Sequence, residues 1–131
     1  MSQPTNPLSP AQGIHILLVE EDENMRRSLH LKLRAHGFEV SSYPAAGLLL
    51  ADARSMSAEI LIADYQLQGT DGIKVLCELR GIGWQGRAIL IAATPSIALR
   101  EAAAAAGYHA VLEKPLRPNE LIRAVTSLRA P

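Results

Sequence analysis

The sequence predicts an α/β protein: a doubly wound parallel sheet in a single domain, with helices on both faces. Short apolar runs alternate five times with segments of helical periodicity along the chain of 131 residues. Such alternation calls for a parallel sheet whose strands are joined by right-handed crossovers. The length allows one hydrophobic core and is too short for a second folding unit of similar size. We expect the domain at residues 13–129, behind a tail at residues 1–12.

The first predicted pair is a strand at residues 14–19 followed by a helix. The strand is an apolar run that ends at the acidic residues 20–22. Apolar side chains from Met25 to Leu33 then recur at helical spacing until Gly37 ends the pattern. The tail before this strand contains prolines among small polar residues, so we expect it to be flexible.

The second and third pairs follow the same plan. Residues 38–43 alternate as a strand, and an alanine- and leucine-rich helix is expected at residues 45–53. Residues 60–63 form a third strand, and a turn with glycines leads to a helix at residues 73–80. On this helix we expect Cys77 to face the core as a small apolar side chain.

The fourth pair begins after a glycine-rich loop that contains Trp84, whose indole we expect to cover the end of the core. Residues 88–91 form the strand. Thr94 is interpreted as the N-cap of the following helix at residues 97–106, and Pro95 fits its first turn.

The last pair is a short strand at residues 110–112, a turn around Lys114, and a helix at residues 118–128 with one apolar stripe. Only residues 129–131 follow that helix. We therefore expect no output domain in this sequence, whether the domain stands alone or is part of a larger chain such as a hybrid kinase.

The charge balance and the composition indicate which partners and which cellular compartment to expect. Lys and Arg number 13, Asp and Glu also number 13, and the formal net charge at pH 7 is zero. The sequence therefore predicts no general attraction to nucleic acid or to an anionic membrane. A single cysteine, no secretory leader and no apolar run of membrane-spanning length favour a cytoplasmic protein.

Charged residues follow three of the predicted strands: Glu20 and Glu21 the first, Asp64 the third and Lys114 the fifth. The carboxyl ends of parallel strands share one edge of the sheet, where α/β proteins bind ligands. The acids predict a site for a hard divalent cation, Mg²⁺ or Mn²⁺, and the lysine a contact for a phosphoryl group. Asp64 is then placed to attack phosphorus. The alternative is structural: a turn carboxylate, acids at a helix start and a solvated lysine.

The chain resembles the response-regulator receiver domain of two-component signalling, from about residue 14 to residue 128. The matching segments are LLVEED at 17–22, IADYQL at 62–67, GTDG at 69–72, AGY at 106–108 and EKPL at 113–116. The resemblance implies a flavodoxin-like (βα)5 fold with strand order 2-1-3-4-5, which brings the first and third strands together at the topological switch point.

The resemblance also implies a role for each matching residue. Asp64 would be the phosphoacceptor that becomes an aspartyl phosphate, and Lys114 the phosphoryl contact. Glu20 and Glu21 would bind Mg²⁺ with Asp64 and the backbone carbonyl of Gln66. The peptide before Pro115 would be cis. The implied partners are a histidine kinase or phosphotransfer protein, and an output protein or second copy on the face formed by residues 97–106, 110–112 and 118–128.

Three positions depart from the family pattern. Glu21 stands where receivers usually have Asp, so we expect weaker metal binding than with two aspartates. Ala92 occupies the position of the usual switch Ser or Thr; Thr94 would have to compensate. Val111 occupies that of the switch aromatic, unless the neighbouring Tyr108 takes over.

Two hypotheses of different class follow. The first is a receiver that accepts a phosphoryl group on Asp64 without turning over an independent substrate. The second is a pseudo-receiver that binds proteins regardless of phosphorylation, which Glu21, Ala92 and Val111 favour. A flavin carrier would need a phosphate-binding loop where the acidic residues 20–22 stand, and an aspartate-nucleophile phosphatase would need an acid in place of Gln66.

Overall fold

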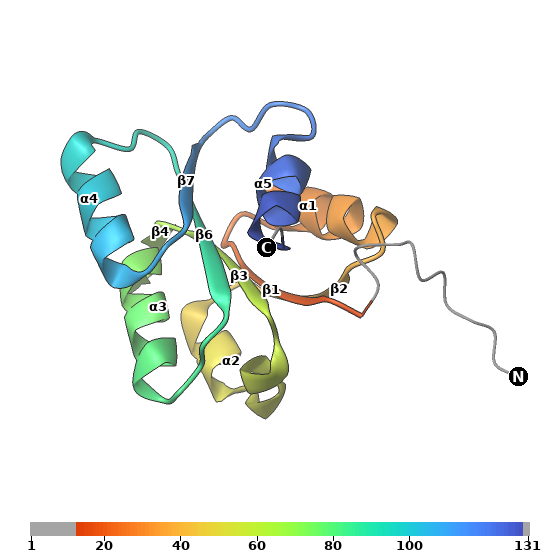
Figure 1. Cartoon of the computed structure of the whole chain (residues 1–131), viewed down its shortest axis with the longest axis horizontal. Helices are drawn as coiled ribbons and strands as arrows, with labels where there is room; N and C mark the ends of the chain where they lie inside the picture. The colour runs from red at the N-terminus through yellow and green to blue at the C-terminus, as the bar shows by residue number, and fades with distance from the viewer. Residues whose placement is uncertain (1–12, 130–131) are drawn as a thin grey trace, which may run out of the picture.

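The computed structural model describes residues 13–129, so the predicted flexible tail lies outside the described residues. Five parallel strands form one sheet in the order β2-β1-β3-β6-β7 (Figure 1). The strands are β1 (His15–Val19), β2 (Glu39–Tyr43), β3 (Ile60–Asp64), β6 (Arg87–Ala92) and β7 (Ala110–Glu113). The fold class and the strand order expected from the sequence are confirmed.

Helices connect successive strands and cover both faces of the sheet (Figure 1). They are α1 (Glu23–Ala35), α2 (Ala46–Ala51), α3 (Gly72–Gly81), α4 (Ile97–Ala106) and α5 (Glu120–Arg129), with a 3-10 helix at Ala53–Ser57. A two-stranded hairpin, β4 (Gln66–Leu67) and β5 (Thr70–Asp71), replaces the simple turn expected before α3.

The core has two halves because successive side chains of a strand point to opposite faces of a sheet. Leu17 and Leu61 belong to the buried cluster on the face covered by α2, α3 and α4. Leu18 and Ile62 belong to the cluster on the face covered by α1 and α5. Both faces of the sheet are therefore buried, and ligands reach it only along its edges and ends.

Two expectations about side chains were wrong. Cys77 is exposed on α3, since the buried stripe of that helix runs through Val75, Leu76 and Leu79. One residue past Leu76 turns the helix by about 100°, which carries Cys77 off the stripe. The N-cap of α4 is Ser96, whose hydroxyl accepts from the backbone N–H of Leu99, and Thr94 is exposed two residues earlier.

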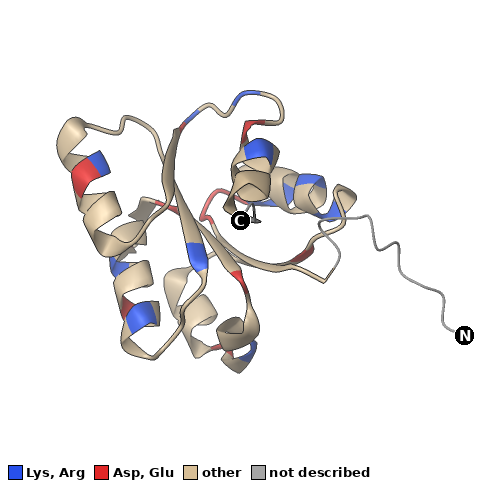
Figure 2. Cartoon of the chain, in the orientation of Figure 1, with Lys and Arg blue, Asp and Glu red and all other residues tan. Residues whose placement is uncertain are grey.

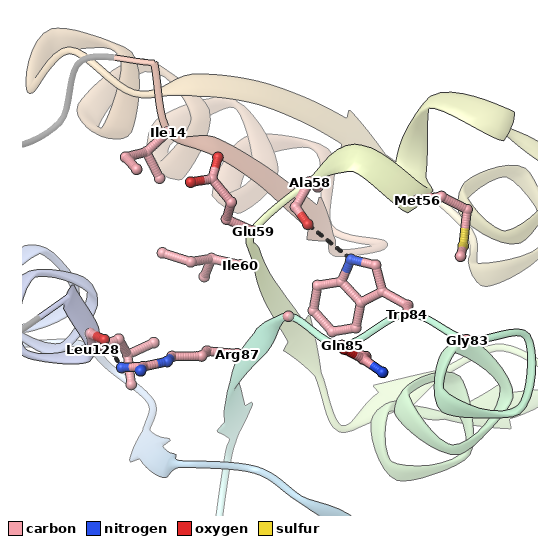
Figure 3. Close-up of a pocket in the computed structure, with 11 residues that line it drawn as sticks. Ile14, Met56, Ala58, Glu59, Ile60, Gly83, Trp84, Gln85, Arg87 and Leu128 are labelled. Atoms are coloured by element: carbon pink, nitrogen blue, oxygen red, sulfur yellow. Dashed lines mark hydrogen bonds between the residues drawn. The ribbon is translucent and has the colours of Figure 1, made fainter. Parts of the chain in front are cut away.

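Trp84 closes the amino-terminal end of the sheet, as the sequence predicts. Its side chain is 2% exposed, and its indole N–H donates to the carbonyl oxygen of Ala58 at 2.9 Å. The guanidinium of Arg80 lies 5.2 Å from the ring centroid. Figure 3 shows the indole in the wall of a cavity of about 630 Å³, which Ile60 and Arg87, the first residues of β3 and β6, also line. This cavity lies at the opposite end of the strands from Asp64.

Candidate functional site

Asp64 is the last residue of β3, and only 5% of it is exposed. The Nζ of Lys114, from the loop after β7, lies 2.7 Å from its Oδ2. Its Oδ1 accepts a 3.2 Å hydrogen bond from the backbone N–H of Gln66. The structure thus brings Asp64 and Lys114 together from positions 50 residues apart. Their contact is an ion pair at the carboxyl edge of the sheet.

Glu20 completes a triad of charges with this pair. It follows β1, and the pairing of Val19 with Ala63 fixes it beside Asp64. Only 2% of it is exposed, and its Oε1 lies 3.6 Å from Lys114 Nζ. Its Oε2 accepts from the backbone N–H of Asp22 at 3.0 Å. Oε1 is buried and has no hydrogen-bond partner among the described residues.

The electrostatics of the triad follow from burial and spacing. Burial raises the pKa of the Glu20 carboxyl, and the negative charge of Asp64 raises it further. Burial alone would lower the pKa of the Lys114 ammonium, but its hydrogen bond to Asp64 and the charges of Asp64 and Glu20 raise it. Lys114 therefore stays charged at neutral pH and holds two buried acids together.

Glu21 does not join this triad. Its side chain is exposed, and its Oε2 accepts a hydrogen bond from the backbone N–H of Gln68, in the turn of the β4–β5 hairpin. The side chain of Asp22 also makes a different contact: it caps α1, because its Oδ1 accepts a 2.9 Å hydrogen bond from the backbone N–H of Met25. Of the predicted acidic pair, only Glu20 faces Asp64.

The donor set fits a hard cation in part. Glu20 and Asp64 offer carboxylate oxygens, and the Oε1 of Glu20, which accepts no hydrogen bond from the described residues, is suited to Mg²⁺, which binds few carboxylates and keeps several waters. Glu21 is turned to the hairpin instead. Accordingly, residues 13–129 contain no group of three acidic, His or Cys side chains that could hold a metal ion. The role expected for the carbonyl of Gln66 stays a prediction.

The three predicted switch positions lie at the end of β6, in the segment between β6 and α4, and on β7. Ala92 is buried at the end of β6, and its carbonyl accepts from the backbone N–H of Lys114 at 2.9 Å. Its methyl group has no hydrogen to donate. Thr94 is exposed, and Val111 is half-buried against the core on the α4 side. None of these three side chains takes part in the hydrogen bonds described around Asp64, so their switch role stays a prediction.

Sequence reasoning named Tyr108 in a matching segment and as a substitute for Val111, but did not predict its contact with Gly72. Its ring is buried, and its hydroxyl donates to the carbonyl oxygen of Gly72 at 2.6 Å. Gly72 packs closely against the backbone of Asp64. A Cβ at this position would lie 2.7 Å from the carbonyl oxygen of Asp64, which leaves no room for a side chain. Burial raises the pKa of the Tyr108 hydroxyl far above its ordinary value, so it remains a donor. The peptide between Lys114 and Pro115 is cis, as the resemblance implies.

The sequence matches the response regulator receiver domain family over residues 16–126, and the chain belongs to that family. Nodulation protein W of Bradyrhizobium diazoefficiens is 30% identical over 112 residues, which is 86% of this chain and 49% of that protein. Response regulator MprA of Mycobacterium tuberculosis is 29% identical over 116 residues, 88% of this chain and 50% of that protein. The chain thus spans about half the length of the curated relatives it matches.

Solved structures agree on the fold. A chain of the CheX–CheY–BeF3–Mg²⁺ complex from Borrelia burgdorferi matches with a TM-score of 0.83 at 18% identity. The match covers 92% of this chain and 92% of that one. The receiver domain of the Francisella response regulator 1452 matches with a TM-score of 0.81 at 20% identity, covering 89% of this chain and 97% of that one. Between residues 13 and 129, no helix has the length and apolar character needed to cross a bilayer.

Proposed function

We propose that Asp64 accepts a phosphoryl group from a histidine kinase or phosphotransfer protein. A carboxylate oxygen of Asp64 would form a bond to phosphorus as the bond from phosphorus to the donor's imidazole nitrogen breaks, and that nitrogen keeps the electron pair and takes up a proton. The observation that carries the proposal is the 2.7 Å pair of Asp64 with Lys114 at the sheet's carboxyl edge. No independent substrate is turned over.

Lys114 and Glu20 have distinct parts in this proposal. Lys114 already contacts Asp64, and its ammonium would move to an oxygen of the incoming phosphoryl group and balance its charge. Glu20 and Asp64 would hold Mg²⁺ or Mn²⁺, which neutralises phosphoryl oxygens when it is bound. The Oε1 of Glu20 supports that role, because it is buried and, among the described residues, has the ion pair with Lys114 at 3.6 Å but no hydrogen bond.

The proposed output surface is the face formed by α4, β7 and α5, in the cytoplasm. Ile97, the first residue of α4, is 77% exposed. Arg100 and Glu101 are the only charged residues of that helix, and Figure 2 shows most of it without charge. Such an exposed, weakly charged helix suits a protein partner or a second copy of the domain.

A pseudo-receiver is the second candidate function, in which the same face binds its partner whether or not Asp64 carries phosphate. Ala92 favours it, since its methyl ends β6 where a hydroxyl would be needed to bind the phosphoryl group. The two functions differ in what phosphorylation changes, while the fold and the binding face are the same in both.

Intact mass spectrometry tests the proposal. The protein is incubated with a small phosphodonor, acetyl phosphate, with Mg²⁺ or with excess chelator. We expect the mass of one added phosphoryl group with Mg²⁺ only, and none on the Asp64→Asn variant. Phosphate on that variant would show that the site is misassigned, and no phosphate on the wild-type protein would favour the pseudo-receiver.

A further inference from the structure

We propose that the backbone N–H of Gln68 is a positioning group that holds Glu21 away from Asp64 and thereby weakens binding of a divalent cation. The inference rests on the cation site of the proposed function. It assigns to the β4–β5 hairpin control over whether a third carboxylate reaches that site. Gln68 acts through Glu21 and touches no cation itself.

Two observations place Glu21 with the hairpin. Its Oε2 accepts from the N–H of Gln68, 47 residues further along the chain. Glu21 also lines, with hairpin residues including Gln66, Thr70 and Asp71, a cavity of about 560 Å³. Glu20, Asp64 and Lys114 do not line this cavity. The carboxylate of Glu21 therefore lies with the hairpin and outside the charged triad.

The side-chain length of Glu21 explains how it reaches the hairpin. Glu20 and Glu21 are neighbours in the loop after β1, yet one is buried against Lys114 and the other is exposed. The extra methylene of Glu, compared with Asp, lets the carboxylate cross to the turn. A charge-assisted hydrogen bond to a backbone N–H is among the stronger polar interactions of a protein surface. A cation that recruits Glu21 must first break it.

The turn of the β4–β5 hairpin allows a substitution that removes only the N–H that holds Glu21. Gln68 and Gly69 are the two central residues between paired Leu67 and Thr70, and Gly69 has φ of 77°. A positive φ at the second central position is the pattern of a type II turn, which favours proline at the first. Gln68→Pro therefore suits the turn and removes the N–H that holds Glu21. Gln68→Ala keeps that N–H and is the matched control.

The experiment is calorimetric titration of the full chain with Mg²⁺, without phosphodonor. Gln68→Pro is expected to tighten binding about tenfold, the ratio that one charged hydrogen bond can supply. Gln68→Ala is expected to match wild type, and Gln68→Pro is expected to bring no gain when Glu21 is Ala. An unchanged affinity in Gln68→Pro, a gain in Gln68→Ala, or a gain that survives without Glu21 would overturn the inference.

A second measurement uses the unmodified protein, in case the proline variant fails to fold. Mg²⁺ is expected to shift the amide resonance of Gln68 and speed its hydrogen exchange, and to do neither in Glu21→Ala. The inference would be overturned if bound Mg²⁺ changed neither the amide resonance nor the hydrogen exchange of Gln68. It would also be overturned if no variant bound Mg²⁺. If Gln68→Pro binds Mg²⁺ more tightly but Asp64 takes no phosphate, only the proposed function fails.

Discussion

The hydroxyl of Tyr108 donates a 2.6 Å hydrogen bond to the carbonyl oxygen of Gly72, and both groups are buried. Gly72 begins α3 and packs against the backbone of Asp64. Tyr108 therefore joins the segment between α4 and β7 to the loop that follows the phosphoacceptor candidate. The link is fixed in the interior, unlike a side chain that swings between surface and core.

Tyr108→Phe should lower the free energy of unfolding by about 1 kcal/mol, because it removes one buried hydrogen bond and leaves the carbonyl of Gly72 without this donor. Urea denaturation followed by circular dichroism measures the change. Tyr65→Phe removes the same atom from a half-buried ring and is the matched control. Equal effects of the two substitutions would show that the link to Gly72 contributes nothing specific.

Gly86→Ala should destabilise the protein by about 1 to 3 kcal/mol, because the new methyl would overpack the end of the core. Its Cβ would fall 2.0 Å from Cζ2 of Trp84, and backbone or indole must move. We expect a fluorescence shift to longer wavelength as the indole becomes wetter. Gly47→Ala is the control, since a Cβ there meets nothing within 4 Å and should stabilise α2 by about 0.5 to 1 kcal/mol. A stable Gly86→Ala variant with unchanged emission would contradict this packing.

His30 should make the protein less stable as the pH falls. Burial lowers the pKa of its imidazole in the folded state, and the charge of Arg34 lowers it further. Its Nδ1 lies 2.5 Å from the hydroxyl of Ser42. In the unfolded chain the imidazole has an ordinary pKa of about 6.5, so it binds a proton at a higher pH than it does in the folded protein. The contribution of neutral His30 to the free energy of unfolding is therefore fully present above that pH and is lost as the pH falls below it. Urea unfolding across this range should show a flatter pH dependence in His30→Gln; an equal dependence in both proteins would exclude this source.

The parallel sheet and the Asp64–Lys114 pair could be predicted because they depend on long-range patterns in the sequence. Apolar runs bounded by charges locate buried strands, and parallel strands bring their ends to one edge. Those two rules place Glu20, Asp64 and Lys114 together without knowledge of any side-chain rotamer. The structure places all three within one hydrogen-bonded and ion-paired group.

The misses depend on local geometry that composition does not encode. Thr94 and Ser96 are both N-cap residues by type, and only the backbone path decides that Ser96 caps α4. Cys77 and Leu76 differ by one helical step, which separates exposed from buried. The contact of Glu21 with Gln68 could not be predicted because it depends on a hairpin whose strands have two residues each, too short to give a periodic pattern. The metal-binding role expected for Glu21 stays a prediction.

The final prediction concerns which residues change conformation when Asp64 carries a phosphoryl group. By the resemblance to receivers, a strand-end hydroxyl and an aromatic side chain would relay that state, and the positions predicted to correspond hold Ala92 and Val111. A coupling between sites of about 1 to 3 kcal/mol is comparable to one charged hydrogen bond, which a methyl cannot form. We therefore expect the phosphoryl mimic beryllofluoride, added with Mg²⁺, to shift amide resonances mainly at residues 20–22, 64–69 and 114.

Ala92→Ser supplies the missing hydroxyl at the end of β6 and is the matched variant for this test. In that variant the shifts should spread to α4 and β7, because the mimic can then bind one conformation more tightly than the other. Wild-type shifts that already cover Ile97–Ala106 and Ala110–Glu113 would show that a two-state switch survives without Ala92 and Val111. That result would remove the main support for phosphorylation-independent binding, and the fixed link from Tyr108 to Gly72 would become the first candidate for the path.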